Sequence, residues 1–143
     1  MTDTRYIRWQ GLAIAQFSVA VALISGLSVA GLGLGLSLLQ NKEFLLPSPL
    51  KSYYAASLAL LLCAAFLSCA AVVTRTLDFR LTARKVRKDT KPTYDKPLTI
   101  FWASADGYGR ATWCLFWGSC VTFAVGVVLL VVSVGSTYTD RLF

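Results

Sequence analysis

The sequence predicts an all-α integral membrane protein with three transmembrane helices. Hydrophobic residues make up 56% of the 143 residues, above the roughly 45–50% of soluble domains, and the mean hydropathy is +0.61. Charged residues make up only 15%, against about 25% in soluble domains. Three long blocks contain no Asp, Glu, Lys or Arg: 12–40, 52–74 and 111–139. Each block exceeds the ~20 residues that a helix needs to cross the hydrocarbon core of a bilayer.

These blocks should be helical, because lipid offers no hydrogen-bond partner to the backbone. We expect helices at about 9–40, 53–90 and 110–138 within a single membrane domain that covers 1–143. Pro47 and Pro49 should exclude helical structure before the second helix. No Gly or Pro then occurs until Pro92, so the second helix should continue beyond the membrane. Asp106-Gly107 is expected to form a turn before the third helix.

The basic residues predict the orientation of the chain. The segment 75–110 carries nine Lys and Arg against four Asp, a net charge of +5. The segment 40–52 carries two Lys and one Glu, a net charge of +1. Since cytoplasmic loops carry the excess of Lys and Arg, we expect the N-terminus inside and the C-terminus outside. The loop 75–110, including the extension of the second helix, should then be cytoplasmic.

The first expected helix carries small residues at every third or fourth position. We call these residues the small-residue face: Gly11, Ala15, Ser18, Ala22, Gly26, Ala30, Gly33 and Ser37. Small side chains let helix backbones approach closely in lipid. Three uses of this face are open, namely packing within one chain, self-association into an oligomer, and lining a pore. Gly31 and Gly35 form a GxxxG pair beside it.

A dense basic stretch follows the second charge-free block. Its candidate contact residues are Arg80, Arg84, Lys85, Arg87, Lys88 and Lys91. The simplest interpretation is that these charges set the topology of the chain. The alternatives are contact with anionic lipid headgroups, worth about 1 kcal/mol per basic residue, and contact with a cytosolic partner. Nucleic acid is not expected, because no aromatic residues alternate with the charges. Asp78 is expected to form a local ion pair, or to orient the extension against Arg110.

Catalytic chemistry finds little support in the sequence. The chain has no His, and we expect no catalytic residue, metal or cofactor. The charge-free spans also disfavour a proton-coupled transporter, which usually needs intramembrane ionisable groups. The four Cys all fall in expected spans, where we expect them as small, buried apolar residues.

Three stretches carry a resemblance to a known group: RYIRWQ at 5–10, RTLDFRLTARKVRK at 75–88 and ATWCLFW at 111–117. Together they resemble small bacterial three-span inner-membrane proteins with a DFRxTAxxxR-like cytoplasmic stretch. The matching positions are Asp78, Phe79, Arg80, Thr82, Ala83 and Arg87. The resemblance implies a multi-pass protein of the bacterial inner (cytoplasmic) membrane, and it carries over no activity.

The sequence therefore predicts a non-enzymatic membrane protein that acts as an oligomer. In its sharpest form this is a homo-oligomeric pore, or another membrane-disrupting effector. The alternative is an accessory or scaffold subunit of a larger membrane complex, with no activity alone. A lipid-processing enzyme is a third class, and it would depend on Asp89, Asp95 or Asp106 in the basic segment.

Overall fold

The computed structural model describes residues 2–40, 48–90 and 104–142, and these ranges contain three helices and no strand. Helix α1 spans Thr2–Gln40, α2 spans Ser48–Thr90 and α3 spans Ala105–Leu142. Each helix contains a stretch that is long and apolar enough to cross a membrane. The prediction of an all-helical chain with three candidate membrane spans is therefore confirmed.

The helices begin earlier than expected. α1 starts at Thr2 rather than near residue 9, and α2 starts at Ser48 rather than near residue 53. Pro49 therefore lies in the first turn of α2, where its fixed φ suits the helix and its missing N–H would have had no intrahelical partner. Sequence reasoning treated this proline as a helix breaker, which it is only in a helix interior.

The expected turn at Asp106-Gly107 is wrong, because both residues lie in the first turn of α3. The backbone N–H of Tyr108 donates to the carbonyl of Ser104 at 3.1 Å, so Gly107 lies within the first turn that this hydrogen bond closes. Asp106 also suits this position, because a carboxylate interacts favourably with the positive end of a helix dipole.

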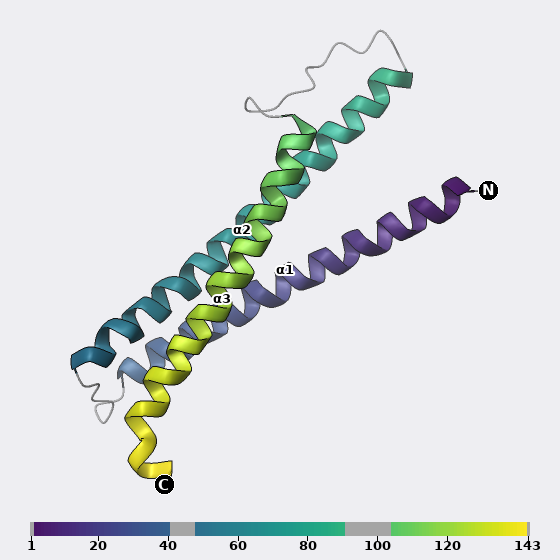
Figure 1. Cartoon of the computed structure of the whole chain (residues 1–143). Coiled ribbons are helices and arrows are strands. Elements are labelled where there is room, and N and C mark those ends of the chain that lie inside the picture. The colour runs from purple at the N-terminus through teal and green to yellow at the C-terminus, as the bar shows by residue number, and fades with distance from the viewer. Residues whose placement is uncertain (1, 41–47, 91–103, 143) are drawn as a thin grey trace.

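The three helices form an open bundle (Figure 1). α2 and α3 lie side by side along most of their length, whereas α1 packs chiefly on α2 and diverges from both towards its N-terminus. The start of α1, the end of α2 and the start of α3 all lie towards one end of the molecule. The helices thus alternate in direction, as consecutive membrane spans must.

The packed centre is small and the outer surface is apolar. Tyr54, Leu61 and Leu130 form the buried cluster. Large apolar side chains such as Leu27, Phe66 and Val128 instead point outwards, with 55%, 68% and 60% of their surface exposed. So extensive an apolar exterior is unusual for a soluble monomer, whereas lipid is a suitable solvent for it.

The expected burial of the cysteines is wrong for three of the four. Cys63, Cys69 and Cys114 are exposed on the surface of the single chain, and Cys120 is partly buried; all four are free thiols. The bundle interior along these spans is taken by still smaller groups, such as the fully buried Ala64, Ser68 and Ala71. Residue size alone therefore did not identify which side of each helix faces inwards.

Candidate functional site

The small-residue face of α1 is uncovered in the single chain. All eight of its residues are exposed. A Cβ atom added at Gly11, Gly26 or Gly33 would meet nothing within 4 Å. Within the described residues, no other helix of the same chain packs against the centre of this face.

The neighbouring GxxxG pair packs against α2 instead. A Cβ atom at Gly31 would lie 3.2 Å from Leu61 Cδ1, and one at Gly35 would collide with Leu58 Cδ2. Gly35 also accepts a hydrogen bond from the hydroxyl of Tyr54 through its carbonyl oxygen. α1 therefore has two faces of small residues, one used inside the chain and one left open.

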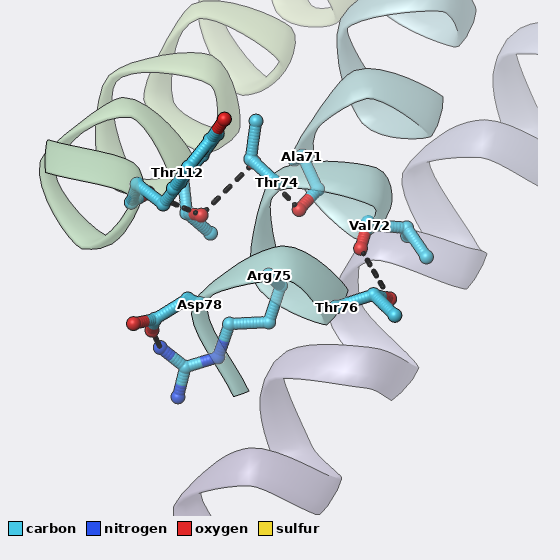
Figure 2. Close-up of polar contacts among 8 residues, drawn as sticks. Ala71, Val72, Thr74, Arg75, Thr76, Asp78 and Thr112 are labelled. Carbon is cyan, nitrogen blue, oxygen red and sulfur yellow. Dashed lines mark hydrogen bonds and ion pairs between the residues drawn. The ribbon is translucent and has the colours of Figure 1, made fainter. Parts of the chain in front are cut away.

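A cationic site lies further towards the C-terminal end of α2, where its charge-free block ends. Arg75 donates from Nη1 to Oδ2 of Asp78 at 3.3 Å (Figure 2). Its Cζ lies 4.8 Å from the ring centroid of Phe79 and 5.8 Å from that of Phe17. Cation–π contacts of this kind hold a guanidinium in place over an aromatic face. Arg75 is therefore fixed by one acid and two aromatic rings.

Phe17 connects this site to the third helix. Its ring centroid lies 5.1 Å from that of Phe116 and 6.1 Å from that of Trp113. Aromatic residues are enriched where membrane spans meet the headgroup region, and Arg75 is the first charge after the charge-free block. The cluster therefore joins all three helices beside the end of the charge-free block of α2.

Asp78 pairs with the arginine one turn before it, and in the described part of the chain no ion pair joins it to Arg110. Both residues line a broad, open depression that also contains Asp106. Of the basic candidates, Arg80 is exposed and Arg84 partly exposed. The backbones of Lys85, Arg87 and Lys88 belong to α2, but their side chains, and all of Lys91, lie outside the described residues.

A groove opens between α1 and α2 beside Arg75. Its volume is about 390 Å³. α1 and α2 supply all of its lining: Phe17, Ser18, Val21, Ala22, Ser25, Ser68, Cys69, Val72, Arg75, Thr76 and Phe79. Ser18 and Ala22 belong to the small-residue face, so the groove runs along one edge of that face. The walls are mostly apolar, and the guanidinium stands at one end.

Two polar groups of this groove are buried without a partner. Within the described residues, neither Oγ of Ser68 nor Nε of Arg75 has a hydrogen-bond partner, and Ser68 is fully buried. Most other groove hydroxyls are accounted for: Ser18 donates to the carbonyl of Ile14 at 3.1 Å and Thr76 to that of Val72 at 2.9 Å. Both residues line the groove, so a small turn of either side chain would present its free donor to a ligand.

Sequence reasoning missed this groove, although a signal was present. Ser68, Val72, Arg75 and Phe79 are spaced by four, three and four residues, which places them on one face of a helix. Such a row of polar, apolar, cationic and aromatic residues at the end of a span could have been singled out. The partner residues on α1 could not, because nothing local in the sequence pairs Phe17 with Arg75.

The described residues contain no group of three or more His, Cys, Asp or Glu side chains that could hold a metal ion. The chemistry that the arrangement supports is recognition: a fixed cation beside an apolar groove, and an open face of small residues. The chain matches no family model, and neither a curated protein nor a solved structure shows significant similarity to it.

Proposed function

We propose that this chain is a non-enzymatic integral membrane protein that acts as a homo-oligomer, assembled through the small-residue face of α1. The observation that carries the proposal is the exposure of all eight residues of that face in the single chain. Helices in lipid associate through small residues, which let backbones approach closely. An uncovered face of this kind, running from residue 11 to residue 37, suits a second copy of α1.

The neighbouring Gly31 and Gly35 support this assignment by contrast. They already bring α1 against α2, so packing within the chain does not need the small-residue face. α1 thereby has one face for the fold and another for assembly. Large residues on its exposed remainder, such as Leu23 and Leu34, suit contact with lipid tails.

The sharpest form of the proposal is a pore that permeabilises the membrane. Three helices enclose little space, so a pore needs several copies around a common axis. α1 would face that axis or the neighbouring copy, and the charge-free spans would give a lining of Ser, Gly and apolar groups. Hydrophobic constrictions of that composition gate by dewetting.

The same proposal places the N-terminus and the basic end of α2 in the cytoplasm of a bacterial cell, and the C-terminus outside its inner membrane. The excess of Lys and Arg between residues 75 and 110 supports this orientation. α2 has 43 residues, or ~64 Å at 1.5 Å per residue, which is twice the thickness of the hydrocarbon core. Its basic end would extend into the cytoplasm and meet anionic headgroups or a partner through Arg80 and Arg84.

The test is the native mass of the protein extracted into lipid nanodiscs, compared between wild type and the variants Gly26→Leu and Gly33→Leu. We expect a single homo-oligomer for wild type and a shift to monomer for both variants. Conductance in planar bilayers, measured on the same samples, should be lost together with assembly. Gly135→Leu on α3 is the matched control, since a Cβ atom there also meets nothing within 4 Å.

Two outcomes would count against the proposal. An unchanged oligomer in both α1 variants would remove the small-residue face from the interface. Co-purification with other chains, and no homo-oligomer, would make the protein an accessory or scaffold subunit whose uncovered face binds a different helix. An oligomer that never conducts would keep the assembly proposal and remove the pore.

A further inference from the structure

We propose that the groove between α1 and α2 is a phospholipid-binding site, with the phosphodiester at Arg75 and an acyl chain along the apolar wall. This goes beyond assembly through α1, because it assigns a ligand class to a groove whose two donors, on Ser68 and Arg75, lie outside the small-residue face. Three features carry it: two unpartnered donors, a fixed guanidinium and the apolar lining.

The donors define the chemistry of the ligand. The guanidinium of Arg75 uses Nη1 for Asp78, and its Nε–H is buried with no partner. The hydroxyl of Ser68 is likewise buried and unpartnered. Buried donors without acceptors are costly, above all in lipid. A ligand that satisfies both donors, once these side chains turn towards the groove, must bring two acceptor groups, and the one at Arg75 should be anionic.

The spacing of the donors matches a diacyl phospholipid better than a small anion. Ser68 lies seven residues before Arg75 on α2, or ~10 Å deeper at 1.5 Å per residue. A free phosphate cannot reach both groups. A glycerophospholipid presents a phosphodiester at one level and ester carbonyls deeper in the membrane, followed by acyl chains. Val21 and Val72 line the groove and would contact such a chain.

The position and fixation of Arg75 support the same ligand. The residue lies at the end of the charge-free block of α2, at the level of the aromatic cluster, which is where phosphates of the bilayer lie. Phe17 and Phe79 hold the guanidinium from two helices, so little side-chain freedom is lost on binding. Ser133 carries the other buried hydroxyl without a partner among the described residues, but it does not line this groove.

The experiment is native mass spectrometry of the full-length protein in detergent, titrated separately with phosphatidylglycerol, phosphatidylcholine, diacylglycerol and inorganic phosphate. We expect both phospholipids to bind with one high-affinity site per chain. Diacylglycerol lacks the phosphodiester and inorganic phosphate lacks the acyl chains, so neither should be retained. Arg75→Gln and Ser68→Ala should each weaken phospholipid binding about ten-fold or more, as expected for loss of a hydrogen bond to a charged or buried group.

Two matched controls separate the site from general effects on the membrane surface. Lys51→Gln removes an exposed charge near the other end of the same helix, outside the groove, and should leave the affinity unchanged. Cys69→Phe fills the groove and should abolish binding, whereas Cys63→Phe adds the same bulk at an exposed position that does not line the groove. Circular dichroism of each variant verifies that the helices are intact.

Several outcomes would overturn the proposal. Equal affinity of wild type and Arg75→Gln for phosphatidylglycerol would exclude Arg75 as the phosphate contact. Tight binding of diacylglycerol would reduce the groove to an apolar slot, and binding of inorganic phosphate alone would make it a soluble-anion site. If Cys69→Phe changed only the oligomeric state, a second copy would be the occupant. If the groove variants lose phospholipid but keep the oligomer, the result supports the phospholipid site, whether or not α1 mediates assembly.

Discussion

Buried hydroxyl groups need a hydrogen-bond partner from the protein, since lipid supplies none. Three buried serines donate to a carbonyl of their own helix: Ser28 to Ile24, Ser57 to Tyr54 and Ser119 to Phe116, at 2.7, 2.7 and 2.8 Å. Such bonds satisfy the hydroxyl but do not join one helix to another. Tyr54 differs, because its hydroxyl donates to Gly35 on α1, nineteen residues away. At the residue scale, this bond fixes α1 against α2.

Tyr54→Phe should therefore destabilise the bundle by about 0.6–1.5 kcal/mol, the range for a hydrogen bond between packed helices. The loss leaves the Gly35 carbonyl only its intrahelical bond and removes no apolar contact area. Unfolding in sodium dodecyl sulfate, followed by helical circular dichroism, measures the change. Tyr53→Phe is the control, since Tyr53 is exposed beside it. Equal stability of the two variants would contradict the role given to this bond.

At the scale of elements, the repeat of the small-residue face defines how two copies of α1 would cross. Its eight residues between 11 and 37 give an average spacing of about 3.7 residues, slightly longer than the 3.6 of a straight α-helix. Two helices that pack through a repeat longer than the helical period wind around each other in a right-handed supercoil. Right-handed crossings in membranes are those of GxxxG dimers, at about −40°. Two α1 helices should then touch near the middle of the face and separate towards its ends.

Disulfide cross-linking can measure this crossing directly. In a chain with its four cysteines replaced, Ala22→Cys should cross-link two copies efficiently, because it lies near the middle of the face. Ser37→Cys should cross-link poorly, since ~20 Å along the helices from a −40° crossing the two axes are displaced sideways from each other by roughly 14 Å. Gel mobility after mild oxidation gives the yields. Equal yields at both positions would indicate a nearly parallel, left-handed pair instead.

At the scale of the whole molecule, the number and type of elements could be predicted from charge and hydropathy alone. Long charge-free blocks admit one solution in lipid, a spanning helix. The face that each helix turns inwards could not be predicted. α1 has small residues on two of its faces. Only the contact of Gly31 and Gly35 with α2 shows which of these faces packs inside the chain. The groove at Arg75 depends on that choice, because Phe17 reaches Arg75 only when this face packs.

The orientation that we propose for the whole molecule rests on the distribution of Lys and Arg and can be tested by surface labelling. In a cysteine-free chain, Lys51→Cys and Ser104→Cys introduce single thiols at exposed positions near opposite ends of the bundle. We expect an impermeant maleimide to label Lys51→Cys in intact bacterial cells. Ser104→Cys should react only after the cells are permeabilised, because the basic segment holds that end inside.

Removing the basic charges tests whether they cause this orientation. Changing Arg84, Lys85, Arg87 and Lys88 together to Gln lowers the net charge of 75–110 from +5 to +1, equal to that of 40–52. The two segments then carry equal net charge and no longer favour one orientation of the chain. Ser104→Cys should therefore become partly accessible from outside. The arginines near the N-terminus, Arg5 and Arg8, are the remaining determinant. If labelling stays one-sided, these two residues orient the chain, and the basic end of α2 is free to serve a ligand or partner.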